Sequence, residues 1–280
     1  MLGDFMKSRK KIVAVVLIAV LTLVFTVGCG NSKSNQKEST KKNITIGVRS
    51  DLVGMYKVVK PVLEKKGYKV TMKSFDDSVQ PDQALKEGSI DINWYQHEPY
   101  MKSYNKENKT NFVMIKPKTY APLFAMYSSK YKKVSDIPDG ATIGLCNDAT
   151  NQDRGLRLLQ KEKMIKLDPS VKVATIHDIK NNPKHLKFKE AEMSVLPQSI
   201  DDVDAICLAG LHMVNAGKDA NNYLAKSNDD KEYAVGFVVN KKDQNAKWAK
   251  DIAKAVQCKE LADYLKKNSK GALIPMWDAK

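Results

Sequence analysis

The chain has 280 residues with a formal net charge of +15, and 42% of its residues are hydrophobic. This length exceeds that of a typical single domain and predicts two lobes with buried cores. A basic balance can indicate a nucleic-acid partner, but lysines scattered along the whole chain supply nearly all of the charge. The residue favoured for bidentate phosphate and base contacts is arginine, and it occurs only at Arg9, Arg49, Arg154 and Arg157. Composition therefore argues against a nucleic-acid binder and favours an exported, lysine-rich surface beside an anionic envelope.

Residues 1–28 are predicted to be an export signal. Basic residues within 7–11 precede an apolar or small-residue run at 12–27. The run is shorter than the roughly 20 residues that cross a bilayer core, and small residues precede Cys29, as in cleavable signals. The alternative is a permanent membrane anchor helix, which the length disfavours.

The four residues that end at Cys29, Thr26-Val27-Gly28-Cys29, resemble a bacterial lipobox. The resemblance implies that Cys29 is acylated and holds the mature chain on the extracytoplasmic face of the cell membrane, in the way that two or more acyl chains anchor a protein. Thr26 departs from the aliphatic residue usual at that position. Residues 29–43 are rich in Ser, Asn, Lys and Thr and nearly free of apolar residues, which predicts a flexible tether.

The body of the chain begins with strand-like runs that alternate with helical patterns. Strands are predicted at 44–48, 69–75, 90–93, 112–115 and 123–127, and helices at 56–66, 84–87 and 100–108. This rhythm of strand, helix and strand favours a mostly parallel sheet covered by helices.

After a turn signal at 137–140 the same rhythm restarts. Strands are predicted at 141–145, 186–191 and 203–208, and helices at 154–163 and 197–200. An apolar strand at 232–240 and a helical tail around Trp248 complete the chain.

The predicted architecture is α/β with two lobes joined at a hinge. Residues 44–127 and 230–280 form the first lobe and residues 128–229 form the second. Loops at the carboxyl ends of parallel strands are expected to face the cleft between the lobes, where ligands bind in open α/β sheets.

Five runs of residues, in this order, resemble segments of the NlpA family, the methionine-binding lipoproteins of ABC importers. They are Asp91–Tyr100, Gly140–Ile143, Asn147–Arg154, Leu196–Ala205 and Lys270–Pro275. The resemblance covers essentially the whole body of the chain. It implies a type II periplasmic-binding-protein fold, capture of methionine or a related small solute by a monomer, and delivery to an ABC transporter permease.

The resemblance assigns ligand contacts to three side chains. Tyr95 and His97 match residues that pack on the methionine thioether, a contact that favours a soft, unbranched side chain. Considered without the family, the pair also fits a core aromatic and a capping histidine. Arg154 matches the arginine that grips the ligand carboxylate with a bidentate fork. It falls at a predicted helix start, which favours anions, although a solvated role like that of Arg157 is the alternative. The same motif assigns Asn147 and Asn151 to the site.

The sequence departs from the family at several polar positions. The family's Asn-Gly-Asn-Tyr run reads Ala209-Gly210-Leu211-His212, a further asparagine is Val235, and a tyrosine is Ser78. The next asparagine of the family is Asp82, and a proline is Cys146. Buried charged groups without partners are costly, so free methionine held in the family's way is expected to bind poorly. With Ser78, Leu211 and Val235 in the site, another amino acid, a short peptide or a less polar solute are the alternatives.

Two other classes of function stay open. Cys146 is expected at a strand end before a helix, where thiol pKa values fall, and His97 or His212 could serve as its base in a Cys-His hydrolase. The lost asparagines also leave room for a ligand-free surface adhesin. A disulfide between Cys146 and Cys207 is conceivable in an oxidising compartment. No serine elbow, metal-ligand cluster or glycine-rich phosphate loop occurs, so we expect no catalytic residue, metal or cofactor.

Overall fold

The computed structural model describes residues 41–278. The predicted signal, Cys29 and the tether up to residue 40 lie outside these residues. Strand β1 (Asn43–Arg49) already begins at the last residue of the predicted tether. No helix between residues 41 and 278 is both long enough and apolar enough to cross a membrane.

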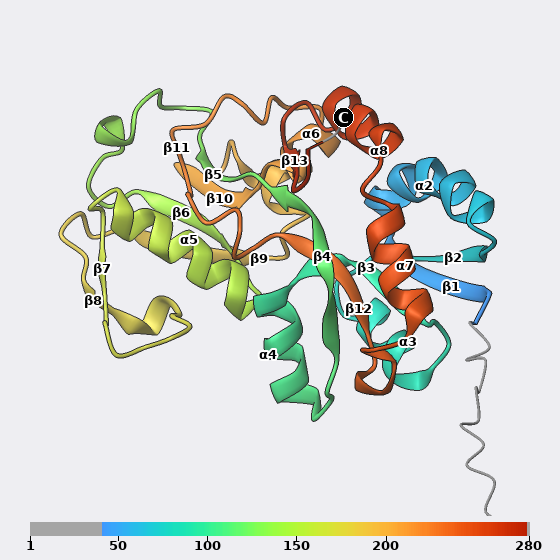
Figure 1. Cartoon of the computed structure of the whole chain (residues 1–280). Coiled ribbons are helices and arrows are strands. Elements are labelled where there is room, and N and C mark those ends of the chain that lie inside the picture. Colours follow the sequence, from blue (N-terminus) through green and yellow to red (C-terminus); the bar gives the residue numbers. More distant parts are fainter. Residues whose placement is uncertain (1–40, 279–280) are drawn as a thin grey trace, which may run out of the picture. The chain divides into compact units, whose positions relative to one another are not determined.

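The first lobe is built on a six-stranded sheet with the order β13-β4-β12-β3-β1-β2 (Figure 1). Besides β1, its strands are β2 (Lys69–Phe75), β3 (Ile92–His97), β4 (Val113–Pro122), β12 (Val235–Val239) and β13 (Leu273–Pro275). β1 pairs in parallel with β2 and β3, whereas β12 enters antiparallel between β3 and β4. The sheet is therefore mixed, and not mostly parallel as the sequence predicted, because the returning strand runs against its neighbours.

The second lobe is built on a five-stranded sheet with the order β11-β5-β10-β6-β9. Its strands are β5 (Phe124–Tyr127), β6 (Thr142–Cys146), β9 (Lys187–Ala191), β10 (Ala205–Ala209) and β11 (Ala225–Lys226), and a separate two-stranded ribbon joins β7 (Lys166–Leu167) to β8 (Ile179–Asn181). β5 was predicted to lie in the first lobe, but it pairs antiparallel with β10 of the second sheet. The chain therefore crosses between the sheets at Leu123, before the expected boundary at residue 128.

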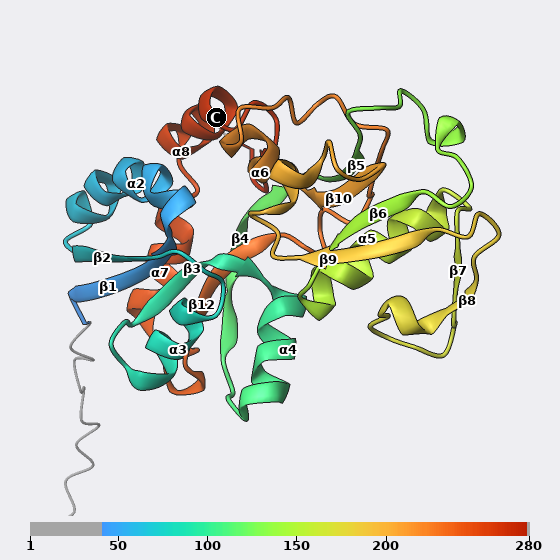
Figure 2. The ribbon, with the colours of Figure 1, turned by 180° about the vertical axis from the view of Figure 1, so that it is seen from behind.

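Helices cover both faces of each sheet (Figures 1 and 2). The first lobe has α2 (Val53–Lys65), α3 (Gln80–Glu87), α4 (Glu98–Asn108), α7 (Lys247–Ala255) and α8 (Lys259–Asn268), and the second has α5 (Ala149–Lys161) and α6 (Gly210–Asn215). Short 3₁₀ turns occur at Ser50–Leu52, Val134–Asp136, Ile176–Asp178, Leu196–Ser199 and Lys241–Asp243.

Side chains of the second sheet alternate between its two faces, as the pleat of a strand requires. Met126 and Cys207 belong to the hydrophobic cluster with the α5 leucines, whereas Tyr127 and Ile206 belong to the cluster with Met213 of α6. Each face of the second sheet thus has its own hydrophobic core.

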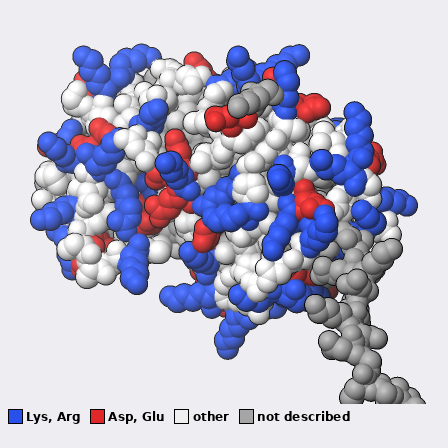
Figure 3. Space-filling view, in the orientation of Figure 1, with Lys and Arg blue, Asp and Glu red and all other residues white. Residues whose placement is uncertain are grey.

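Lysines and arginines are spread over the whole face drawn in Figure 3, with acidic side chains among them. They do not gather in a single basic stripe on that face, which is the arrangement typical of nucleic-acid binders.

The core of the first lobe centres on aromatic residues from three strands. Trp94 of β3 stacks on Phe237 of β12 with ring centroids 4.9 Å apart, and its indole N–H donates to the hydroxyl of Thr119 at 2.9 Å. Phe237 is fully buried. This cluster fixes β3 and β12 against each other. The last residue of β3 and the first residue of β12 both line the cavity described below.

We predict that Phe237→Ala lowers the free energy of unfolding by about 3–5 kcal/mol, since it removes the stacked ring and leaves a cavity. Urea unfolding of the purified protein measures the change. Val173→Ala is the control, because Val173 is 46% exposed, and its effect is expected within about 0.5 kcal/mol. An equal loss in both variants would contradict the assignment of this core.

Candidate functional site

A cavity of about 260 Å³ is lined by residues of both lobes. Most of its lining follows the carboxyl ends of β1, β2 and β3 in the first lobe and of β6, β9 and β10 in the second. This is the position where open α/β sheets bind ligands. All eight side chains predicted for the site line this cavity: Ser78, Tyr95, His97, Asn147, Asn151, Arg154, Leu211 and Val235.

His97 connects the two lobes. It is the last residue of β3, which continues past the predicted end at residue 93. It caps α4 by accepting the Tyr100 N–H on Nδ1 at 3.1 Å. The proton of the neutral ring is therefore on Nε2, which lies 3.2 Å from Oδ1 of Asn151 on α5. Burial, with the nearby charge of Arg154, lowers the pKa of His97 to about 3. The imidazole is consequently neutral at physiological pH, and it combines the capping role and the cavity role that the sequence left as alternatives.

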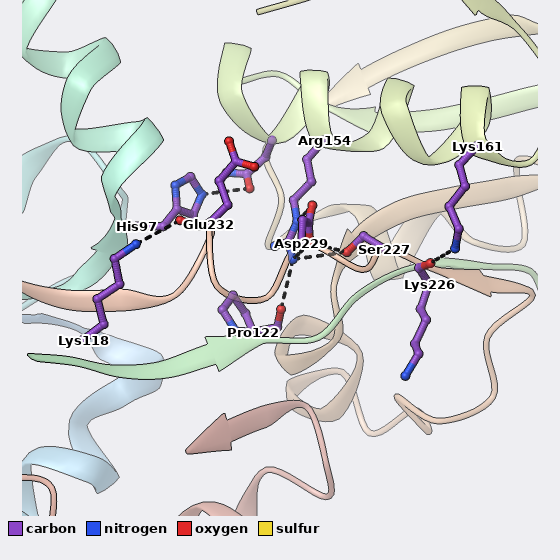
Figure 4. Close-up of polar contacts among 10 residues, drawn as sticks. His97, Lys118, Pro122, Arg154, Lys161, Lys226, Ser227, Asp229 and Glu232 are labelled. Atoms are coloured by element: carbon purple, nitrogen blue, oxygen red, sulfur yellow. Dashed lines mark hydrogen bonds and ion pairs between the residues drawn. The ribbon is translucent and has the colours of Figure 1, made fainter. Parts of the chain in front are cut away.

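Arg154 lies on the second turn of α5 and is only 1% exposed. Its Nε donates to Oδ2 of Asp229 at 2.8 Å and one terminal nitrogen donates to Oδ1 at 2.5 Å (Figure 4). That same terminal nitrogen also reaches the Pro122 carbonyl and the Ser227 hydroxyl. The bidentate fork predicted for a ligand is thus directed at Asp229.

The guanidinium of Arg154 lies between two aromatic rings and keeps one nitrogen free. Its central carbon is 4.6 Å from the ring centre of Phe124 and 4.3 Å from that of Tyr233, within the range of cation–π attraction. Nη1 is buried and has no hydrogen-bond partner among residues 41–278. Because an unpaired buried donor is costly, this atom is the part of Arg154 that suits an acceptor placed in the cavity.

Asp229 balances the buried charge of Arg154. Burial alone would raise the pKa of Asp229, but the hydrogen bond and charge of Arg154 hold it below its ordinary value. The ion pair leaves Arg154 with little net charge to offer a ligand beyond the Nη1 donor.

The two predicted asparagines differ in their freedom. Asn151 donates from Nδ2 to the Asp148 carboxylate at 3.0 Å and accepts from His97, so both ends of its amide are engaged. Asn147 is exposed, and its backbone N–H pairs with Ala191. Of the two, Asn147 therefore has the side chain that remains available to a ligand.

One wall of the cavity is apolar where the family pattern has asparagines. Val235 is 3% exposed at the start of β12, and Leu211 packs on the cores of both lobes. Ala209 also lines the cavity. A hydrocarbon or thioether side chain would fit this wall better than a polar head group.

Ser78 holds a network of tyrosines through its backbone. Its carbonyl accepts from the hydroxyls of Tyr95 at 2.7 Å and Tyr100 at 3.0 Å, and its own hydroxyl accepts from Arg49 at 2.8 Å. The Tyr95 hydroxyl also lies 3.0 Å from Oδ2 of Asp82.

The single hydroxyl hydrogen of Tyr95 cannot serve both Ser78 and an ionised Asp82. Burial raises the pKa of Asp82 to about 6, although hydrogen bonds from Tyr95, Gln96 and Asn93 oppose the rise. Below this pKa, a protonated Asp82 can donate to the Tyr95 oxygen while Tyr95 donates to Ser78; above it, the ionised carboxylate and the Ser78 carbonyl compete for the one hydroxyl hydrogen. An asparagine, as in the family pattern, would supply this donor at every pH through its N–H.

Several polar side chains of the lining were not predicted. They are Arg49, Asp51, Asp77, Gln96, Tyr120, Asp148, Glu192 and His212. Arg49 directly follows the strand predicted at 44–48, and Glu192 directly follows the one predicted at 186–191. The rule that ligands bind beyond strand ends would therefore have selected both.

The hydrolase alternative is not supported by the surroundings of Cys146. Its thiol is fully buried in the core beside α6 and does not line the cavity. Burial raises its pKa well above the ordinary value, the opposite of an activated thiol. Cys146 and Cys207 are free, and they belong to the cores on opposite faces of the second sheet, which accounts for the missing disulfide.

Comparison with known proteins gives consistent matches over almost the whole chain. The sequence model of the NlpA lipoprotein family matches residues 44–277 of this chain. The chain is 32% identical to the probable D-methionine-binding lipoprotein MetQ of Pasteurella multocida, covering 93% of this chain and 97% of that one. It is 31% identical to the methionine-binding lipoprotein MetQ of Bacillus subtilis, covering 92% and 97%. A nutrient-binding protein from Burkholderia cenocepacia, solved bound to methionine, is 33% identical, with a TM-score of 0.79 over 84% of this chain and 100% of that one.

We predict that Asp82→Asn raises the free energy of unfolding at pH 7 by about 1–3 kcal/mol. The folded pKa is about 6 against 3.8 for the free side chain. Between these values the folded protein keeps a proton that the unfolded chain releases, so stability falls as pH rises through this window. The neutral amide removes that loss, and the gain should vanish near pH 4.

Urea unfolding at pH 4 and pH 7 measures this difference, with the exposed Asp202→Asn as the control for removal of one charge. A lower stability of Asp82→Asn at pH 7 would show that the fold stabilises the ionised carboxylate of Asp82 and does not penalise it.

Proposed function

The chain belongs to the NlpA lipoprotein family, and we propose that it captures an amino acid, methionine or a related small solute, between its lobes. The captured solute is delivered to the permease of an ABC importer. The protein works outside the cytoplasm as a monomer, held to the cell membrane by a lipid on Cys29. Its named relatives are binding proteins, and the proposal assigns it no catalytic step.

One observation carries this proposal. Nη1 of Arg154 is a buried donor without a partner among the described residues, and it belongs to a side chain that lines the interlobe cavity. A carboxylate is the acceptor that pairs best with a guanidinium N–H. His97 and Tyr95 line the same cavity from the first lobe, so a carboxylate on Arg154 would bring the remainder of the ligand against them.

Binding is coupled to closure of the lobes in this proposal. A ligand that touches both lobes favours the closed arrangement by its differential affinity for that state. Arg154 and Asn147 come from the second lobe, and Tyr95, His97 and Ser78 come from the first. The closed form alone allows one small molecule to use both sets.

We predict that Arg154→Lys weakens binding of the captured amino acid by about 1.5–3 kcal/mol, the range for a hydrogen bond to a charged group. Lysine keeps the positive charge beside Asp229 but has no planar fork with a second free nitrogen. Thermal melting against a panel of amino acids and dipeptides identifies the ligand, because a ligand at 100 times its Kd adds about 2.7 kcal/mol. Calorimetry then compares the variant with the original protein.

Arg157→Lys is the matched control, since Arg157 lies on the same helix but is 45% exposed and paired with Asp153. Equal affinity of both variants would remove Arg154 from the site. If no compound of the panel raises the melting temperature, the result would instead favour the ligand-free adhesin.

We predict that Cys29→Ser releases the protein from the membrane fraction, because an oxygen in place of the thiol cannot be converted to the lipid-bearing thioether. Fractionation of cells producing the original chain and the variant measures the distribution. Cys258→Ser, on the described and partly buried cysteine, serves as the control and should stay with the membrane. Retention of Cys29→Ser in the membrane would indicate an uncleaved anchor helix.

A further inference from the structure

The cavity is acidic although the protein as a whole is strongly basic. The formal net charge of the chain is +15. The cavity lining, however, contains four carboxylates and only two guanidinium groups: Asp51, Asp77, Asp148, Glu192, Arg49 and Arg154. A cavity lined by an excess of carboxylates suits a positively charged group on its ligand.

Three of the four carboxylates are already engaged. Asp51 forms a two-point contact with Arg49, with nitrogen–oxygen distances of 3.1 and 3.3 Å. Asp77 accepts the N–H groups of Val79 and Gln80 at the start of α3, and Asp148 caps α5. These contacts satisfy local backbone or ion-pair needs within the protein.

Glu192 is the remaining carboxylate. It lies just beyond β9, is half-buried, and its Oε2 accepts both the N–H of Ser194, at 2.7 Å, and the hydroxyl of Ser194. Oε1 makes no hydrogen bond or ion pair with residues 41–278, so Glu192 has both charge and an acceptor to offer.

Arg49 is less free than Arg154 to bind an anion, because each of its three side-chain nitrogens already donates to the protein. Nε and Nη2 donate to Asp51, and Nη1 donates to Ser78. Burial lowers the pKa of Arg49, but the charge and hydrogen bond of Asp51 and the charge of Glu192 raise it overall.

Two buried polar atoms of the lining that can accept hydrogen bonds also lack partners; one of them, the Tyr120 hydroxyl, can donate as well. The Tyr120 hydroxyl and Gln96 Oε1 have none among the described residues, and each side chain is only 2% exposed. Gln96 Oε1 is an amide oxygen and can only accept, and the orientation of the amide is fixed because Nε2 donates to Asp82 at 2.6 Å. An orphaned acceptor of this kind is satisfied by a donor-rich group in the cavity.

We propose that the ligand carries a protonated amine at the end opposite its carboxylate, with the carboxylate at Nη1 of Arg154 and the amine near Glu192 and Tyr120. This proposal rests on capture at the interlobe cavity and names the ligand class. An ammonium supplies three donors, which suits Glu192 Oε1, the Tyr120 hydroxyl and a third acceptor of the lining.

Two classes of ligand carry a carboxylate at one end and a protonated amine at the other. The far amine is either the side chain of a basic amino acid or the amino terminus of a dipeptide. In both, the apolar wall of Leu211 and Val235 would contact the hydrocarbon between the two charged ends.

The experiment uses ligand pairs that differ only in the far amine. Calorimetry on the full chain in detergent compares lysine with norleucine, and alanyl-alanine with its N-acetyl form. The amine-bearing member of at least one pair is expected to bind about 10- to 100-fold tighter, the span of a charge-assisted hydrogen bond. The pair that shows the preference identifies the source.

Glu192→Gln is expected to abolish that preference, whereas Asp202→Asn, which removes one exposed carboxylate of the same lobe, should leave it intact. If norleucine or methionine binds as well as the amine-bearing ligands, the far amine is refuted while capture of an amino acid stands. If no member of either pair binds and the wider panel is also silent, capture itself fails. Because the ligand pairs are compared first on the original protein, poor folding of Glu192→Gln cannot hide the outcome.

Discussion

The buried guanidinium of Arg154 is the constraint on which the rest of the site depends. A charge that is 1% exposed must be balanced inside the protein, since an uncompensated buried charge costs several kcal/mol. Asp229 supplies the balance, and Phe124 and Tyr233 close over the two faces of the group. Because Asp229 and Tyr233 belong to the segment that returns to the first lobe, this charge fixes the path of the chain between the lobes.

Arg154 also binds the other connection. It donates to the carbonyl of Pro122, immediately before the chain enters β5. A single side chain of the second lobe therefore holds both connecting segments (Figure 4). The fork that was predicted to grip a carboxylate at two points is occupied by Asp229, and only Nη1 lacks a partner among the described residues.

Much of the fold follows from patterns visible in the sequence, and the errors have identifiable causes. The runs at 44–48 and 69–75 become β1 and β2 because apolar residues alternate between short turns. β4, by contrast, continues to Pro122 past the predicted end at residue 115. Lysines and a proline interrupt the alternation of apolar residues at this point. The strand continues because β12 and β13 pair with it, and the sequence does not show that pairing.

The site was predictable to the extent that it follows strand ends or family motifs. Tyr95, His97 and Arg154 came from motifs, and their side chains do line one cavity. Tyr120 could not be found because it belongs to the part of β4 that was missed. Nor could Asp229, since it lies in a polar stretch with Asp230 next to it, and only the folded path decides which carboxylate meets Arg154.

The contacts that join the lobes differ in strength, and this difference determines what an opening motion would disturb. Two hydrogen bonds join side chains of the two lobes: His97 to Asn151 at 3.2 Å and Asn215 to Asp51 at 3.4 Å. Contacts of this kind contribute about 0.5–1.5 kcal/mol each, or somewhat more for a charged acceptor at good geometry. Separating Arg154 from Asp229 would cost about 3–5 kcal/mol, as for a buried pair that loses one partner. An opening motion would therefore break these two contacts before it separated Arg154 from Asp229, and under the proposed function a carboxylate would meet a donor that is already in place.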